Sequence, residues 1–229
     1  CLGWLFTTGL LVASVSLPAQ VRTPDIRVDE VGFGEAWLRA TRSQLNERVD
    51  PFCLDLLETW LTRLRNYLDI GTLPLTPLCL NSSGFNAFAA PGGIVAMNRG
   101  VYQALATEAE VMAVLAHELA HLALRHHVRG LRQQEGVTPA RLAMLAGLFA
   151  AIATEQGTAA QSLIMGGQAA ELQNQLAYSR EYEREADRLG VVALSGAGYR
   201  PEAMVAVLKY LADQQTRGRT DLAFLSTHP

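Results

Sequence analysis

The sequence has few charged residues and no internal repeats, and both features argue against particular classes of protein. Charged residues make up 18% of the 229 residues, and the net charge is −3. No long basic run occurs, so nothing indicates a nucleic-acid partner. Apolar residues reach 49%, which is typical of an ordinary globular protein rather than a disordered one. The chain is therefore long and apolar enough to bury a sizeable core.

Cysteine is also scarce, with only Cys1, Cys53 and Cys79 in the chain. Neither internal cysteine belongs to a Cys-x-x-Cys pair, which makes both poor candidates for metal ligands. In an exported protein Cys53 could pair with Cys79 in a disulfide. Buried free thiols are the alternative, and both interpretations stay open at this point.

Long apolar runs are confined to two places. Residues 1–21 carry no charge and predict a secretory signal peptide or an N-terminal membrane anchor, with a buried N-terminal helix as the alternative. Residues 22–34 are expected to be a polar tether, and residues 35–229 to form one domain. The second run, Leu142 to Ala153, is too short for a membrane span, which needs about 20 residues. It is interpreted as a core helix or as a lid that dips into a membrane.

The spacing of apolar residues predicts a mainly α fold with a small β-sheet, an α+β architecture. Two short apolar runs around Pro91-Gly92-Gly93 predict a β-hairpin. Thr107 and Glu110 form a capping-box pattern, which opens a helix expected to run to about His127. Other helices are expected over residues 36–68 with an interruption near Asp50-Pro51, over 169–194 and over 202–215.

The pattern His117-Glu118-Leu119-Ala120-His121 is the strongest chemical signal in the chain. Histidines four apart on a helix lie about 40° apart around its axis, so both imidazoles can reach one ion. Zinc accepts imidazole nitrogen and, in catalytic sites, keeps one position for water. Glu118 can then act as the general base for that zinc-activated water. The alternative is two histidines beside a solvated glutamate, but the apolar flanks disfavour it because buried histidines are costly without a partner. His126 and His127 are interpreted as the polar end of this helix.

A third metal ligand is expected in the acidic stretch from Glu181 to Gly190. At about 100° per residue, Glu183 and Asp187 fall on the packed face of this helix, whereas Glu181 and Glu185 fall on a solvated face. A buried carboxylate needs a cation or strong donors. Glu183 is therefore assigned to the zinc, and Asp187 to the free ring N–H of a ligand histidine. A helix laced with Glu–Arg pairs is the alternative.

Further motifs extend this pattern along the chain. They are Asn86-Ala87-Phe88-Ala89 with Pro91-Gly92-Gly93, Ser179-Arg180 ahead of Glu183-Arg184-Glu185-Ala186-Asp187, Ala197-Gly198-Tyr199 with Pro201, and Ser226-Thr227-His228-Pro229. With the paired histidines, these motifs resemble metallopeptidase family 48, which includes the HtpX-type membrane proteases, the BepA-type periplasmic proteases and the CAAX prenyl proteases. The resemblance covers residues 86–228 and is closest to the periplasmic BepA-type.

The resemblance implies a gluzincin-type zinc metallopeptidase fold for residues 35–229 and one zinc ion per chain. The metal ligands it implies are His117, His121 and Glu183. It also implies zinc metalloendopeptidase activity.

The resemblance further implies a substrate site on the strand Asn86-Ala87-Phe88, which would border the cleft. An extended protein or peptide substrate could add there as a further strand. His228 matches a histidine that, in periplasmic relatives, approaches the zinc and either blocks it or assists with the oxyanion.

The predicted function is a periplasmic zinc endopeptidase that hydrolyses peptide bonds of misfolded or envelope proteins. The main alternative is a latent zinc-containing chaperone or assembly factor of the cell envelope, with His228 in the open zinc position. A third interpretation is a membrane-tethered interaction module that uses Leu142 to Ala153.

Overall fold

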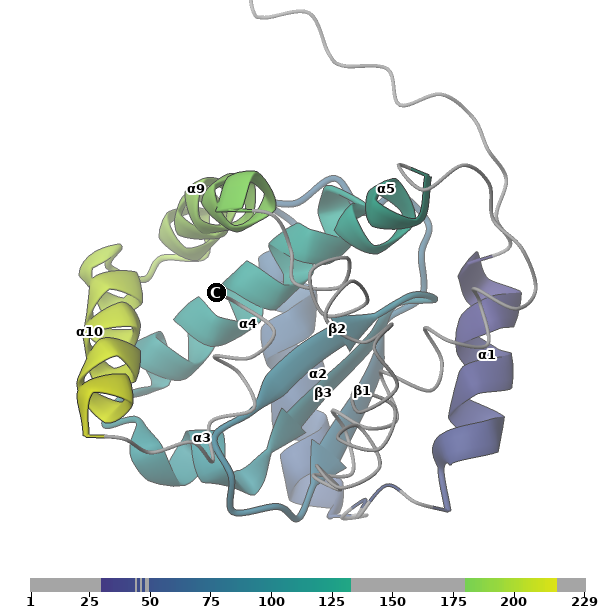
Figure 1. Ribbon diagram of the computed structural model, residues 1–229, viewed down its shortest axis with the longest axis horizontal. Helices are drawn as coiled ribbons and strands as arrows, with labels where there is room; N and C mark the ends of the chain where they lie inside the picture. The colour runs from purple at the N-terminus through teal and green to yellow at the C-terminus, as the bar shows by residue number, and fades with distance from the viewer. Residues whose placement is uncertain (1–29, 44, 46, 48–49, 133–179, 218–229) are drawn as a thin grey trace, which may run out of the picture.

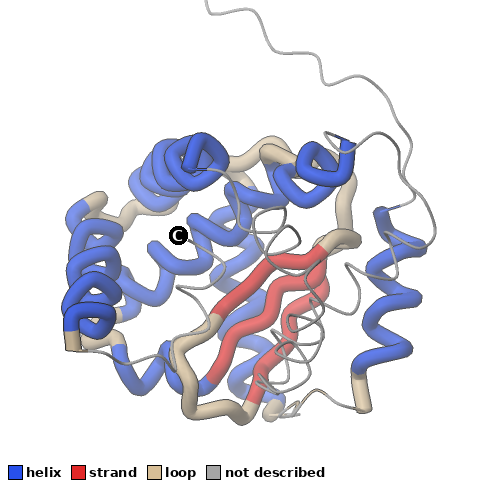
Figure 2. The backbone as a smooth tube through the Cα atoms, in the orientation of Figure 1, coloured by secondary structure: helices blue, strands red, loops and turns tan. Residues whose placement is uncertain are grey.

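The computed structural model describes residues 30–43, 45, 47, 50–132 and 180–217. These residues form helices around a small sheet, which confirms the predicted mainly α architecture (Figure 2). In chain order the elements are α1 (Glu30–Thr41), α2 (Pro51–Arg65), β1 (Thr76–Leu80), β2 (Ala87–Ala90), β3 (Ile94–Asn98), α3 (Arg99–Ala104), α4 (Glu108–Ala123), α5 (His126–Arg132), α9 (Arg180–Gly196) and α10 (Glu202–Thr216).

The sheet has the strand order β1-β3-β2, with β3 in the centre. Strands β2 and β3 are antiparallel, which confirms the hairpin predicted around Pro91-Gly92-Gly93. Glycine is required at Gly93, because its φ is 81° and an added Cβ would lie 1.8 Å from the carbonyl oxygen of Pro74. Strand β1 pairs with β3 in parallel, a pairing that the local pattern did not predict. Strand β2 is thus an edge strand, and it contacts α4 (Figure 1).

Both faces of the sheet are covered, so its strands are buried on two sides. Val95 and Met97 of β3 face a core shared with α2 and α4. Ile94 and Ala96, the alternate residues, face Trp37 of α1. Every residue of α4 from Val111 to Leu122 is buried, so this helix forms the centre of the domain.

Local signals explain where the two central helices begin. Helix α2 starts with Pro51 at its first position, and the Asp50 side chain accepts a hydrogen bond from the backbone N–H of Phe52 at 3.1 Å. Helix α4 has the predicted capping box: Thr107 accepts from the N–H of Glu110, and the Glu110 carboxylate accepts from the N–H of Thr107. Because these caps hold the helix start, the register of α4 along its buried face is set from its first turn.

Two predicted boundaries were wrong, and a third lies outside the described residues. Helix α1 begins at Glu30, inside the range predicted to be a tether. Helix α4 ends at Ala123 rather than near His127, because Arg125 adopts a left-handed conformation with a φ of 52° and α5 then starts in a new direction. Helix α9 is described only from Arg180, so the earlier part of the predicted helix lies outside the described residues.

A disulfide joins Cys53 of α2 to Cys79 of β1, which decides between the two interpretations of these cysteines. Among the described helices, none combines the length and the apolar character that crossing a membrane requires. Residues 1–21, the run from Leu142 to Ala153, and His228 lie outside the described residues.

Candidate metal centre

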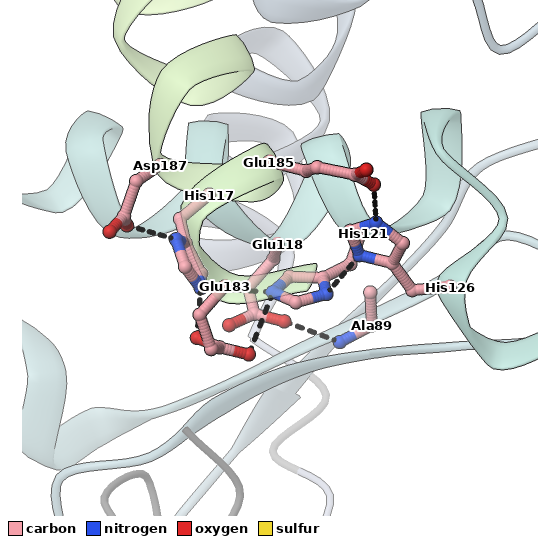
Figure 3. Close-up of polar contacts among 8 residues, drawn as sticks. All are labelled: Ala89, His117, Glu118, His121, His126, Glu183, Glu185 and Asp187. Carbon is pink, nitrogen blue, oxygen red and sulfur yellow. Dashed lines mark hydrogen bonds and ion pairs between the residues drawn. The ribbon is translucent and has the colours of Figure 1, made fainter. Parts of the chain in front are cut away.

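The two motif histidines lie on the most deeply buried part of α4. His117, Glu118 and His121 have exposed fractions of 6%, 2% and 0%. Helix α9 packs along α4 and brings Glu183 to the same place (Figure 3). Gly190 makes this close approach possible, because an added Cβ would lie 3.2 Å from the backbone nitrogen of His117.

Three side chains converge on one point between α4 and α9. Nε2 of His117 lies 3.0 Å from Nε2 of His121 and 3.4 Å from Oε2 of Glu183. Nε2 of His121 lies 3.6 Å from Oε1 of Glu183, and this buried oxygen makes no hydrogen bond within the described part of the chain. Among the described residues, these three form the only group of metal-ligating side chains whose donor atoms converge.

These separations fit one tetrahedral zinc ion. Zinc binds imidazole nitrogen and carboxylate oxygen at about 2.0–2.2 Å, so the ligand atoms of one tetrahedral ion lie roughly 3.3–3.6 Å apart. The three observed distances of 3.0, 3.4 and 3.6 Å bracket this range. Two imidazoles and one carboxylate are also a donor set that zinc uses in catalytic sites. The donors therefore suit the metal in both chemistry and spacing.

Glu118 lies beside this group and is held by the edge strand. Its Oε2 accepts a hydrogen bond from the backbone N–H of Ala89 at 3.0 Å. Burial raises the pKa of Glu118 to about 8, and the charge of Glu183 adds to the rise, while His117 and the Ala89 N–H oppose it. A carboxyl whose pKa lies near neutral pH can both accept and return a proton, as a general base requires.

Asp187 supports the other side of His117. Its Oδ1 lies 3.0 Å from Nδ1 of His117, which leaves Nε2 of that ring to face His121 and Glu183. Burial lowers the pKa of His117, but the hydrogen bonds to Asp187 and Glu183 and the charges of Glu118 and Glu183 together raise it to about 10. The arrangement thus holds a positive charge at this point, as a bound cation would.

His126 and Glu185 also belong to this cluster, contrary to their predicted roles. His126 is 1% exposed rather than part of a polar helix end, and its Nδ1 lies 2.9 Å from Nδ1 of His121. Its Nε2 lies 3.0 Å from Oε2 of Glu185, which also accepts from Arg129 at 2.6 Å. Glu185 faces α5, which a helical wheel of α9 alone does not include. No spacing rule in the sequence signals this contact, because it depends on the turn at Arg125.

Residues 61–229 match the sequence profile of Peptidase family M48, over more than half of the chain. The chain belongs to peptidase family M48. This assignment agrees with the resemblance derived from the motifs and identifies a metallopeptidase domain.

Named relatives share this domain over part of their length. A beta-barrel assembly-enhancing protease of Yersinia pestis is 29% identical over 93% of this chain and 46% of its own length. The beta-barrel assembly-enhancing protease of Escherichia coli K12 is 27% identical over 87% of this chain and 41% of its own length. The mitochondrial metalloendopeptidase OMA1 of Saccharomyces cerevisiae is 32% identical over 63% of this chain and 39% of its own length. The chain thus spans less than half the length of these relatives.

The strand predicted to bind substrate in this M48 domain lies next to Glu118. Asn86 and Ala87 are buried at its start, and the Phe88 side chain points to the far face of the sheet, where it packs edge-on against Trp37. The Phe88 side chain therefore does not reach the metal centre, whereas Ala87 and Ala89 face the core that contains α4. Ala89 belongs to the same motif but was not among the predicted substrate-binding residues, and it supplies the N–H that donates to Glu118.

Proposed function

We propose that the chain is a zinc-dependent endopeptidase with a gluzincin-type site. His117, His121 and Glu183 would hold one zinc ion, and Glu118 would be the general base. The observation that carries this proposal is the convergence of three ligand atoms from α4 and α9 within 4.8 Å of one another, with Glu118 directly beside them. Membership of family M48 supports the same assignment.

In the proposed peptide hydrolysis, the metal and the protein side chains have different roles. Zinc, when bound, acts as a Lewis acid that polarises the scissile carbonyl and activates a water molecule. A carboxylate oxygen of Glu118 takes a proton from the attacking water, whose oxygen forms a bond to the carbonyl carbon. Glu118 then returns that proton to the amide nitrogen as the C–N bond breaks. Asp187 keeps His117 in the tautomer that presents Nε2 to the metal.

Substrate binding is proposed at the edge of β2 that faces away from β3, which no other described strand pairs with. Successive residues of a strand point their backbone groups to opposite edges, and the N–H of Ala89 points to Glu118 rather than to β3. Ala87, two residues earlier, shares that orientation. An extended peptide could align along this edge and pass the metal centre. Of the three residues predicted to bind substrate, Ala87 offers its backbone groups to this edge, whereas Asn86 and Phe88 direct theirs to β3.

The names of relatives and the disulfide support a proposal for the substrates and the compartment. Two relatives are named beta-barrel assembly-enhancing proteases, which favours misfolded or envelope proteins as substrates. The Cys53–Cys79 disulfide favours an oxidising compartment, as expected for an exported protein in the periplasm. Residues 1–21 would serve as the signal peptide or N-terminal anchor.

Zinc content and casein cleavage, measured together, test this proposal. The wild type should bind one zinc ion per chain and cleave casein. Glu118→Gln should retain its zinc and lose at least about 100-fold in rate, because the general base is removed and the metal ligands remain. Glu58→Gln, which alters an exposed glutamate on α2, is the matched control and should behave as the wild type.

Each failure would have a distinct meaning. A wild type that binds no zinc would overturn the ligand assignment. Zinc binding without cleavage by any variant would favour the latent chaperone instead. Undiminished cleavage by Glu118→Gln would show that the general base lies elsewhere.

A further inference from the structure

His126 occupies the space between a proposed metal ligand and a carboxylate on another helix. Its Nδ1 lies 2.9 Å from Nδ1 of His121, and its Nε2 lies 3.0 Å from Oε2 of Glu185 (Figure 3). Both ring nitrogens therefore have partners, although the side chain is only 1% exposed. An imidazole that only filled space at such a position would cost more desolvation than an apolar ring.

The proton positions along this chain of contacts follow from the proposed metal site. If Nε2 of His121 faces the metal, its proton must be on Nδ1. That N–H then donates to Nδ1 of His126, so His126 carries its proton on Nε2 and donates it to Glu185. One arrangement of protons satisfies every contact from Glu185 to His121.

The surrounding residues hold His126 in this orientation. Its ring stacks on Tyr182 of α9, with ring centroids 4.5 Å apart and planes at 7°. Arg129 lies over the Tyr182 ring at 4.6 Å and also binds Glu185. The left-handed residue Arg125 ends α4 and turns the chain so that His126 points back toward His121. Three side chains, those of His121, Glu185 and Tyr182, thus contact the His126 ring, and Arg129 holds two of them.

We infer that His126 is a positioning residue for the metal centre, linking Glu185 to the ligand His121. This inference rests on the proposed function, since it assumes that His121 binds zinc. It gives the two ligand histidines different supports: His117 donates directly to the carboxylate of Asp187, whereas His121 reaches the carboxylate of Glu185 through a neutral imidazole. Partners of this kind orient ligand histidines and commonly change metal affinity by about 10- to 100-fold when removed.

Two substitutions of His126 separate positioning from packing. His126→Phe keeps a ring to stack on Tyr182 and removes both nitrogens. His126→Asn loses the ring but places an amide oxygen close to the position of Nδ1, where it can accept from His121. A role in packing predicts that the phenylalanine variant is the milder change, whereas a role in positioning predicts that the asparagine variant is.

The test measures zinc affinity by competition with a chromophoric chelator, together with the absorption spectrum of the cobalt(II)-substituted protein. His126→Phe should weaken zinc binding by about 10- to 100-fold and alter the cobalt spectrum, and His126→Asn should recover most of both. Thermal unfolding of the chelator-treated variants checks that each remains folded. A His126→Phe protein with wild-type zinc affinity and cobalt spectrum would overturn the inference, whereas a wild type that binds no zinc would overturn the proposed function with it.

Substitutions of Glu185 test the same inference if His126→Phe does not fold. This residue is partly exposed, so its replacement leaves the core intact. Glu185→Ala should weaken zinc binding, while Glu185→Gln keeps an acceptor for His126 and should lose less. Equal, wild-type affinity in both variants would contradict the inference.

Discussion

Oδ1 of Asp187 lies 3.0 Å from Nδ1 of His117, across the interface between α9 and α4. This contact orients the ring, so we expect Asp187→Ala to weaken zinc binding by about 10- to 100-fold. Asp187→Asn retains an acceptor oxygen and should lose less. Zinc titration with a competing chelator measures both, and Asp213→Ala, an exposed aspartate on α10 that pairs with Arg217, is the control. Unchanged zinc affinity in Asp187→Ala would show that Asp187 does not position His117 for metal binding.

Zinc binding should release protons at neutral pH. His117 has a pKa raised to about 10, so it is protonated at pH 7 and must lose that proton to become a ligand. Glu118, with a pKa raised to about 8, is also largely protonated and would lose its proton near a bound cation. The affinity for zinc should therefore rise with pH between 6 and 8, by about tenfold or more per pH unit. Calorimetric titration in buffers of different ionisation heat measures the protons released, and a value near zero would be incompatible with these pKa shifts.

The close approach of α9 to α4 at Gly190 should be necessary for metal binding. An added Cβ would lie 3.2–3.3 Å from backbone atoms of His117 and Ala116, which cannot move without shifting α4. Gly190→Ala gains about 1 kcal/mol in helix propensity but costs about 1–3 kcal/mol in overpacking, so we expect a small loss of stability. Zinc affinity should fall more clearly, because the shift separates Glu183 from the histidines.

Gly71→Ala is the matched control for this substitution. Gly71 has a φ of 56° and open space around it, so alanine costs about 1–2 kcal/mol through the backbone alone. It should leave zinc affinity at the wild-type value. If Gly190→Ala binds zinc as tightly as Gly71→Ala does, the packing of the two helices does not control the site.

The Cys53–Cys79 disulfide should contribute to stability and not to the site. Its cysteines are 26 residues apart, and loop-closure entropy assigns a crosslink of that length about 3.5 kcal/mol. The double variant Cys53→Ala, Cys79→Ala should unfold at lower urea concentration than the oxidised wild type and bind zinc with equal affinity. A difference in unfolding free energy below about 1 kcal/mol would argue against a disulfide in the folded protein.

The parts of the fold predicted from the sequence are those with local signals. The capping box at Thr107, the Asp50-Pro51 start of α2 and the Pro91–Gly93 turn each involve neighbouring residues, and all three were confirmed. The parallel pairing of β1 with β3 was missed because it joins distant segments. Distant pairings leave no local pattern to detect.

In the metal site too, the features with a local sequence signal were predicted and those that join distant segments were not. The helical wheel correctly turned Glu183 and Asp187 toward His117, because α9 packs on α4 along that face. It placed Glu185 in solvent, because a wheel of one helix cannot include α5, whose direction depends on the left-handed Arg125. Left-handed conformation at an arginine has no sequence signature, unlike at a glycine.

X-ray absorption at the zinc K-edge of the zinc-loaded protein reports directly on the atoms that bind the metal. We expect nitrogen and oxygen ligands at about 2.0–2.2 Å from the zinc, two of them imidazoles, and one imidazole fewer in His117→Ala. A shell containing sulfur at about 2.3 Å, or one that His117→Ala leaves unchanged, would contradict the assignment of zinc to His117, His121 and Glu183.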